Sequence, residues 1–350
     1  MYENSYLGED LIFIISQPRS GSTLLQRVLS GHPDIQTSAE TWLMLHPLYV
    51  HRTQNIESEY NSKWASIAVS EFIDYYTDGP EVYDTALRLW AQTIYGNALK
   101  KGNKKLFLDK TPRYYFIVPD LYRLFPKAKF IFLLRNPMAV LASEINTYIK
   151  GNWPFMSKLA VDLIDAPDLI LEGIELLGSD AIVVHYEKFA SDPEENIKKL
   201  CKRLDLKFYP SMLDYSKTDA PKGRLNDHAG IHQHTNVSNV SIEKWKKMAV
   251  SPEERYFAIS YLESLGKNTI EKYGYSYDDI KKTLTDDGCN DSTMIFPWNI
   301  AIKPKEKWSF RNKLTADIYF LVKEHGPIKG YSIAFKNTLR RLLKKFNLSK

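Results

Sequence analysis

The sequence predicts an α/β protein with a mostly parallel β-sheet, covered by helices on both faces. Short apolar runs rich in β-branched and aromatic residues alternate with longer segments of helical periodicity. This alternation favours a parallel sheet, because the crossover between two parallel strands is usually a helix. The chain of 350 residues is 44% hydrophobic and 25% charged, which excludes a disordered or fibrous protein and allows one large domain with additions.

The expected elements follow one another in a regular order. Four runs have the length and apolarity of buried strands, and they cover residues 11–16, 105–108, 129–134 and 181–185. Six segments have helical periodicity, and they cover residues 22–30, 62–76, 80–100, 113–125, 137–149 and 193–204. Ligands of such sheets bind beyond the carboxyl ends of the strands. The residues directly after each strand are therefore the first candidates for function.

We expect a single α/β domain over residues 1–290 and a basic extension over residues 291–350. Within the domain, an aromatic helical insert covers about residues 42–104 and a mobile polar loop covers about residues 217–241. The insert has the composition of a cap over a substrate, and equally of an ordinary packing layer.

The net charge of +5 is unevenly distributed, and the positive charge is concentrated at the end of the chain. Residues 301–350 carry thirteen Lys or Arg and three Asp or Glu, a net charge of +10, so the first 300 residues carry −5. Basic and apolar residues alternate at helical spacing in this extension. It fits a peripheral contact with an anionic membrane, a contact with an acidic substrate, or a solvated helix that covers the domain.

Several features indicate a cytoplasmic protein. Cys201 and Cys289 can form at most one disulfide, which favours a reducing compartment. The N-terminal residues are polar and acidic, unlike a secretory signal, so we expect either a cytosolic protein or one whose upstream piece is missing. The apolar runs are far shorter than the roughly 18 residues that a membrane span needs.

The turn after the first strand has the composition of an anion site. Gln17-Pro-Arg-Ser-Gly-Ser-Thr23 stands between the strand and the helix that begins at residue 22. Backbone N–H groups at such a helix N-terminus bind anions, and Gly21 allows a close approach. The Walker A pattern is not met, because Ser16 and Ser22 stand where its first glycine and its lysine would be. The pattern G-x-S-x-G of a nucleophilic serine is also absent.

These residues resemble the sulfotransferases that use 3′-phosphoadenosine 5′-phosphosulfate (PAPS), of the bacterial type and close to the carbohydrate and protein-tyrosine branches. In that family a P-x-S-G-[ST]-T loop grips the 5′-phosphosulfate, and Pro18-Arg-Ser-Gly-Ser-Thr23 matches it. A second motif, a strand that ends in Arg with Ser eight residues later, binds the 3′-phosphate, and Arg135 and Ser143 supply it. The resemblance covers roughly residues 10–250.

The resemblance implies a P-loop-like fold and transfer of a sulfuryl group from PAPS to an acceptor hydroxyl, with 3′,5′-adenosine bisphosphate (PAP) as the other product and no metal. The acceptor is then a carbohydrate, a glycolipid or another metabolite, with no role for nucleic acid. The expected donor-binding residues are Arg19, Ser20, Gly21, Ser22, Thr23, Arg135, Ser143 and Tyr186. Arg19 and Lys110 are expected to stabilise the developing charge, and Glu40 to act as the base.

Two other functions stay open from the sequence. A kinase or NTPase needs a carboxylate to hold Mg²⁺, and Asp109 after the second run is the candidate. A non-catalytic module would bind the nucleotide without turnover. The spacing of His228, His232 and His234 allows a metal site, but no acidic or cysteine cluster supports one. A histidine of this segment is an alternative base, and Trp245 follows the segment.

Overall fold

The computed structural model describes residues 6–52, 56, 58–149, 155–214, 221, 242–247 and 252–285, together with residues 318, 322, 326–329 and 331–336. The chain divides into two compact units, Met1–Ile302 and Lys303–Lys350. The described residues of the second unit include helical turns at residues 327–329 and 331–336. Across the described residues of the whole chain, we find no helix with the length and apolarity to cross a membrane.

A five-stranded parallel sheet forms the centre of the first unit, which confirms the predicted fold class. Its strand order is β2-β3-β1-β4-β5, and every neighbouring pair is parallel. The strands are β1 (Leu11–Ser16), β2 (Ile35–Thr37), β3 (Leu106–Lys110), β4 (Lys129–Leu134) and β5 (Ala181–His185). Strand β2 was not predicted, because its three residues are too few for an apolar pattern. Strand β3 runs two residues beyond its expected end and includes Asp109 and Lys110.

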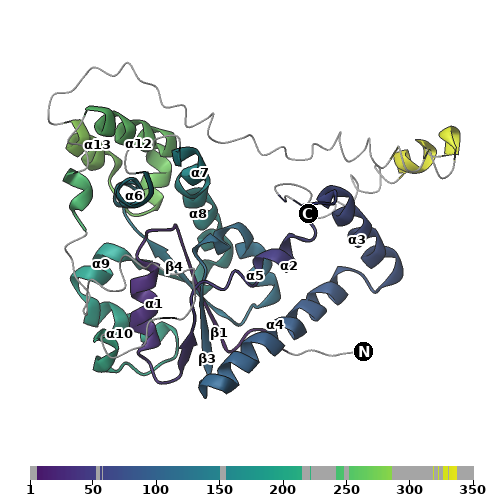
Figure 1. Ribbon diagram of the computed structural model, residues 1–350, viewed down its shortest axis with the longest axis horizontal. Helices are drawn as coiled ribbons and strands as arrows, with labels where there is room; N and C mark the ends of the chain where they lie inside the picture. The colour runs from purple at the N-terminus through teal and green to yellow at the C-terminus, as the bar shows by residue number, and fades with distance from the viewer. Residues whose placement is uncertain are drawn as a thin grey trace. The chain divides into compact units, whose positions relative to one another are not determined.

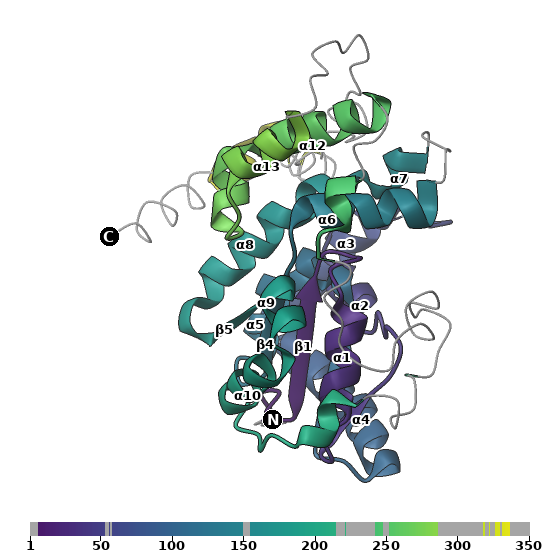
Figure 2. The same cartoon turned by 90° about the vertical axis from the view of Figure 1, so that its left-hand side faces the viewer.

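Alternate residues of β1 enter two different apolar layers. Phe13 and Ile15 pack on the face covered by α4, α5 and α8, whereas Ile12 and Ile14 pack on the face covered by α1, α9 and α10. Figures 1 and 2 show these helices on the two sides of the strands. Their bounds are α1 (Ser22–Ser30), α4 (Pro80–Gly102), α5 (Val118–Leu124), α8 (Ala166–Leu177), α9 (Tyr186–Ser191) and α10 (Pro193–Arg203).

A third apolar cluster lies beyond the carboxyl ends of β1 and β4 (Figures 1 and 2). Its helices are α6 (Pro137–Glu144), α7 (Met156–Ala160), α12 (Pro252–Lys272) and α13 (Tyr277–Thr285). Two π-helical turns interrupt this region, η2 (Ile145–Ile149) and η4 (Val161–Asp165). The helix expected over residues 137–149 is therefore α6 followed by a π turn. Such turns are rare and occur frequently at functional sites.

The remaining short helices complete the first unit. The 3-10 helix η1 (Pro112–Ile117) precedes α5, so the helix expected over residues 113–125 is split. Pro119 explains the break, because its missing N–H cannot continue the hydrogen-bond ladder. The others are η5 (Gly178–Asp180), η6 (Pro210–Leu213) and η8 (Lys244–Lys247).

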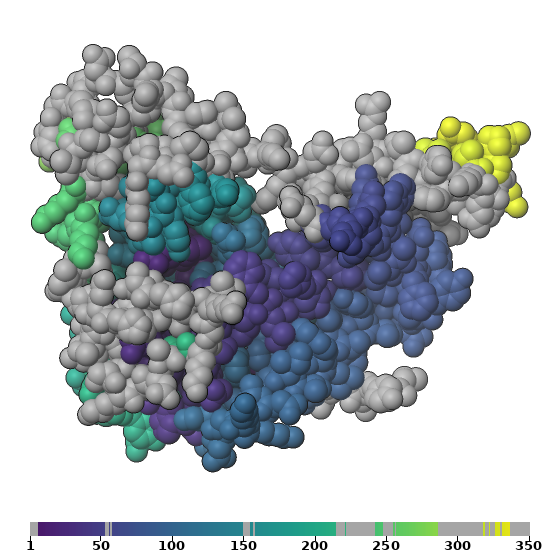
Figure 3. Space-filling view, viewed as in Figure 1, coloured from purple at the N-terminus to yellow at the C-terminus, as the bar shows by residue number. Residues whose placement is uncertain are grey.

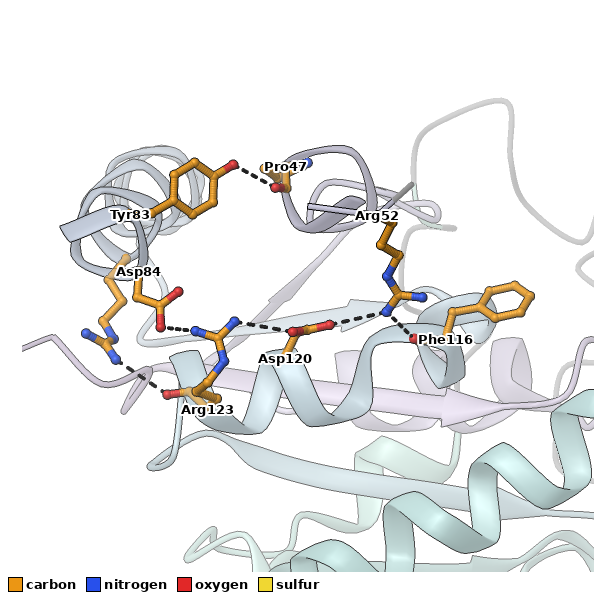
Figure 4. Close-up of polar contacts among 8 residues, drawn as sticks. Pro47, Arg52, Tyr83, Asp84, Phe116, Asp120 and Arg123 are labelled. Atoms are coloured by element: carbon orange, nitrogen blue, oxygen red, sulfur yellow. Dashed lines mark hydrogen bonds and ion pairs between the residues drawn. The ribbon is translucent and has the colours of Figure 1, made fainter. Parts of the chain in front are cut away.

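The segment between β2 and β3 holds α2 (Leu45–Tyr49), α3 (Ser62–Tyr76) and α4. Helix α4 packs on the sheet and on α5, and α3 packs on α4. Polar contacts tie this segment to α5 (Figure 4): Arg123 pairs with Asp84 and Asp120, and Arg52 pairs with Asp120. The outer surface of α3 and α4 is largely visible in Figure 3, and Phe72 and Tyr75 on α3 are exposed.

Candidate active site

The turn between β1 and α1 has the backbone of an anion-binding loop. Arg19 and Gly21 both have positive φ, 64° and 88°, and α1 begins directly afterwards at Ser22. A Cβ atom at Gly21 would lie 2.5 Å from the ring of Tyr186, so only glycine fits there. The first N–H groups of α1 have no partner within the helix and point out of its N-terminus. No acidic side chain lies in this first turn.

Three hydroxyl side chains of the same turn add hydrogen-bonding capacity. The Ser20 hydroxyl is buried and has no hydrogen-bond partner within the described residues. Ser22 is buried as well, and Thr23 follows it at the start of the helix. A buried hydroxyl without a partner is costly to a folded protein. The turn therefore has the donors and the charge that suit a phosphate or sulfate group.

Arg135 and Ser143, which lie far from the turn in sequence, meet it in space. Arg135 follows the end of β4, and its Nη1 donates to the backbone oxygen of Arg19 at 2.8 Å. The Arg19 Nε in turn donates to the Ser143 Oγ at 3.0 Å, from the last turn of α6. The Arg135 guanidinium also lies 4.4 Å from the centre of the Tyr186 ring. The structure thus brings together Arg19, Gly21, Arg135, Ser143 and Tyr186.

A second pair of predicted residues lies at the neighbouring strand ends. Lys110 ends β3, and its Nζ donates to the Glu40 Oε1 at 3.0 Å. The lysine side chain is 1% exposed and the Glu40 side chain is 21% exposed. The lysine is therefore buried, and Glu40 lies between it and solvent. Because β3 lies directly beside β1, this pair and the turn that holds Arg19 share one edge of the sheet.

Trp42 fixes the other oxygen of Glu40. Its indole Nε1 donates to the Glu40 Oε2 at 3.1 Å, and its backbone has a positive φ of 53°. A positive φ is unfavourable for a bulky residue and is held here by its surroundings. The Arg113 guanidinium lies 5.6 Å from the centre of the indole ring. Sequence reasoning missed Trp42, because an aromatic residue after Glu40 fits an apolar helix equally well.

Asp109, the candidate Mg²⁺ ligand of the kinase alternative, is buried inside the protein. Its carboxylate accepts hydrogen bonds from the hydroxyls of Thr41, Tyr95, Thr111 and Tyr114, at 2.6 to 3.0 Å. Burial raises its pKa, although these four hydrogen bonds oppose the shift. The carboxylate therefore holds the protein together and does not face a ligand, which removes the residue on which the kinase alternative rested.

A second buried carboxylate, Asp162 on η4, was not predicted. It accepts two hydrogen bonds from Arg113, at 3.0 and 2.6 Å, and one from the Tyr115 hydroxyl. The Gln17 side chain donates to the backbone oxygen of the same residue at 3.1 Å. Asp162 thus links the turn after β1 to η1, directly beneath the site. No local pattern around residue 162 could have indicated this, because all its partners are distant in sequence.

Glu144, the neighbour of Ser143 in α6, was also missed. The residue is 1% exposed, and its Oε2 has no hydrogen-bond partner within the described residues. Burial raises the pKa of this carboxyl to about 8, against the opposing charges of Arg19 and Arg113 and with a contribution from Asp162. A carboxyl group of this kind keeps its proton near neutral pH.

The remaining predictions fall largely outside the described residues. The loop at 217–241, with His228, His232 and His234, lies there apart from Pro221, which is buried. Trp245 is described and buried, in η8 against α6. Among the residues that the structure describes, no three His, Cys, Asp or Glu side chains lie close enough together to hold a metal ion.

Comparison with known proteins points to one family. Residues 10–210 match the model of the sulfotransferase family. The nodulation protein NoeE of Sinorhizobium fredii is 30% identical over 275 residues, which cover 67% of this chain and 60% of NoeE. A putative protein-tyrosine sulfotransferase of Caenorhabditis briggsae is 28% identical over 63% of this chain and 74% of its own length.

Among solved structures, the chain is similar to the sulfotransferase domain from the curacin biosynthetic pathway. It is 21% identical, covers 69% of this chain and 92% of its own length, and has a TM-score of 0.49. The aligned part of this chain spans 60% of NoeE and 40% of the protein-tyrosine sulfotransferase of Drosophila melanogaster. The match to the family model extends over more than half of the 350 residues, and the chain belongs to the sulfotransferase family.

Proposed function

We propose that this protein is an enzyme that transfers a sulfuryl group from PAPS to an acceptor hydroxyl on a carbohydrate, a glycolipid or another metabolite. The observation that supports this proposal most is a contact between two segments that are each suited to bind an anion: the turn after β1, and the end of β4 with α6. Arg135 bonds to the backbone of Arg19 at 2.8 Å, and Arg19 bonds to Ser143 at 3.0 Å. Two adjacent anion sites suit a ligand with a charged group at each of its 3′ and 5′ positions, which PAPS carries.

The residues at the edge of the sheet fit this donor. The N–H groups at the start of α1, together with Ser20, Ser22 and Thr23, would hold the 5′-phosphosulfate. Arg135 and Ser143 would hold the 3′-phosphate, since a guanidinium presents a planar fork to phosphate oxygens. Tyr186, packed against Gly21 and Arg135, keeps the two segments in place. PAPS supplies a sulfuryl group whose bond to the 5′-phosphate oxygen breaks as a bond to the acceptor oxygen forms.

Side chains of the protein would stabilise the negative charge that develops during transfer and accept the proton of the acceptor hydroxyl. Arg19 and Lys110 neutralise negative charge that builds on the transferred group and on the departing phosphate. Glu40 accepts the proton that the acceptor hydroxyl loses as its oxygen attacks. In the structure Lys110 occupies one oxygen of Glu40 and Trp42 the other. We therefore infer that Lys110 turns from Glu40 toward the donor, while Trp42 keeps the carboxylate in position.

The proposal also covers the acceptor and the location of the enzyme. Relatives named as protein-tyrosine sulfotransferases act on a hydroxyl group, as the proposed mechanism requires. Tyr148 is half exposed, and the Arg19 guanidinium lies 6.0 Å from its ring centre, so an aromatic side chain borders the site. We propose a cytoplasmic enzyme whose basic extension, with a net charge of +10 over residues 301–350, contacts an anionic membrane or an acidic substrate.

The test is calorimetric titration with PAP in the presence of EDTA, compared with 5′-AMP and ATP. We expect PAP to bind with the same affinity with and without EDTA, and 5′-AMP to bind at least tenfold more weakly. Arg135→Ala should abolish this preference, and Arg19→Ala should weaken binding of every nucleotide. Arg123→Ala on α5, a matched loss of an arginine away from the site, should leave binding unchanged.

Two outcomes would reject the proposal in different ways. If PAP binds no better than 5′-AMP, or if binding of ATP requires Mg²⁺, the two-anion site does not exist as described. If PAP binds but labelled PAPS transfers no label to any hydroxyl acceptor in a broad screen, the protein is a non-catalytic nucleotide-binding module. Transfer in the presence of EDTA that is lost in Glu40→Gln would support the proposed chemistry.

A further inference from the structure

The proposed reaction leaves one buried carboxyl group beside the donor residues without a role. Glu144 is the last residue of α6 and precedes the π turn η2, and its neighbour Ser143 accepts the hydrogen bond from Arg19. Glu144 is 1% exposed, and its Oε2 has no hydrogen-bond partner within the part of the chain that the structure describes. Buried polar atoms almost always have such a partner. The position of this carboxyl therefore calls for a functional explanation.

Charged and titratable groups face Glu144 from four elements. Arg19 lies on the turn after β1, Arg113 on η1, Asp162 on η4 and Tyr261 on α12. Arg113 and Asp162 form a bidentate pair, so their charges largely cancel. Arg19 instead donates from Nε to the neutral hydroxyl of Ser143. Of these four groups, Arg19 is the one that belongs to the proposed donor site, so a change in the charge of Glu144 would reach donor binding through it.

The two protonation states of Glu144 have opposite effects on the donor site. As a neutral acid, Glu144 carries no charge that would attract the Arg19 guanidinium. As a carboxylate it attracts the Arg19 guanidinium, and it repels the phosphates of any nucleotide bound at the adjoining turn. Burial favours the neutral form, since it raises the pKa of this carboxyl to about 8. The change between the two states thus falls just above neutral pH.

We propose that Glu144 is a positioning residue that controls donor binding through Arg19: the neutral acid leaves the guanidinium to the donor, and the carboxylate draws it away. This inference rests on the proposed function, because it requires an anionic nucleotide next to Arg19. By linkage, a ligand that binds the protonated protein better also raises proton affinity. Binding of the nucleotide above pH 8 must therefore take up a proton from solution.

Titration of PAP across pH 7 to 9.5 tests this inference, because phosphate groups, with a second pKa of about 6, are already about 90% ionised at pH 7 and change little above it. We expect the affinity of the wild-type protein to fall above pH 8, by up to about tenfold per pH unit. Glu144→Gln, which mimics the neutral acid, should keep its pH 7 affinity up to pH 9.5. Glu175→Gln, an equal charge change at an exposed position of α8, should follow the wild-type profile.

A second measurement does not depend on any variant folding. Wild-type titrations at pH 8.5 in two buffers of different ionisation enthalpy report the protons taken up, and we expect an uptake of up to about three quarters of a proton, the fraction of Glu144 that is ionised at that pH. An uptake near zero, or the same pH profile in Glu144→Gln as in wild type, would overturn the role of Glu144 and leave the donor site intact. If PAP fails to bind in preference to 5′-AMP even at pH 7, the donor site itself is wrong, and this inference falls with it.

Discussion

The polar contacts beneath the sheet edge and those that attach α4 to α5 are built differently. Under the site, Asp109 and Asp162 are almost completely buried, and hydroxyl, guanidinium or amide donors from several elements surround them. Between α4 and α5, Arg123 is about half exposed and pairs with Asp84 and Asp120 (Figure 4). Both regions contain networks of similar size. They differ in whether water can replace a lost partner.

This difference indicates where the fold fixes geometry. A buried carboxylate that loses a donor has no other partner, so the network around Asp109 holds β3, and hence the backbone of Lys110, in one position. An exposed ion pair loses little when it breaks, because water and salt compensate for the loss. We therefore expect the carboxyl ends of the strands to be held firmly, whereas the ion pairs between α4 and α5 contribute little energy.

The largest expected effect comes from the buried network. Asp109→Ala leaves the hydroxyls of Tyr95 and Tyr114 without their acceptor, and we expect a loss of roughly 3–5 kcal/mol in the free energy of unfolding. Urea unfolding measures it. Asp120→Ala in the exposed network should lose less than about 1 kcal/mol. Equal losses in the two variants would contradict the contrast between the regions.

Glu144 sharpens the comparison, because it is a buried carboxyl without such a network. Its pKa is raised from 4.5 to about 8, so the folded protein binds more protons than the unfolded chain between these values. Stability from this group is fully present below about pH 4.5 and is lost as the pH rises through 8. We expect Glu144→Gln to be more stable than wild type at pH 9 by on the order of 2–4 kcal/mol, and about equal at pH 5. Urea unfolding at both pH values tests this; a difference that does not depend on pH would contradict it.

Trp42 tests whether the rigid edge also orients the proposed base. Trp42→Phe keeps an aromatic ring and removes the N–H that bonds to the Glu40 Oε2. We expect kcat to fall about tenfold, the equivalent of one hydrogen bond of about 1.4 kcal/mol to a charged group, with PAP affinity unchanged. The matched control is Trp64→Phe on the exposed side of α3. A loss of PAP affinity, or an unchanged kcat, would show that Trp42 does not act through Glu40.

The sequence predicted the sheet well because buried parallel strands are short, continuous apolar runs. Strands β1, β4 and β5 have the expected bounds. Strand β2 was missed because three residues carry no detectable period, and its pairing with β3 supplies its stability. The π turns were missed for another reason. The apolar pattern of residues 137–149 fits a regular helix, and only packing in the third cluster favours the extra residue per turn.

The residues of the candidate site could be predicted where they belong to one short sequence motif. The turn around Gly21, and the spacing from Arg135 to Ser143, are local patterns that follow strands, and the fold brings them into contact. Asp162 and Glu144 have no such pattern. Each acquires its environment from elements far apart in sequence, and a single acidic residue in an apolar helix gives no sign of that. Burial and tertiary contacts, and not residue type, define this second group.

The smallest expected effect belongs to the exposed network, and it tests the comparison from the other side. Arg123→Ala removes the contacts to Asp84 and Asp120, and its side chain is 48% exposed. We expect the free energy of unfolding to fall by less than about 1 kcal/mol, and the difference to shrink further in about 0.5 M NaCl, where charges are screened within a few ångströms. Urea unfolding at low and high salt measures both effects. A loss above about 2 kcal/mol that persists in high salt would mean that α4 is held as firmly as the site, and that the helical segment belongs to the rigid part of the fold.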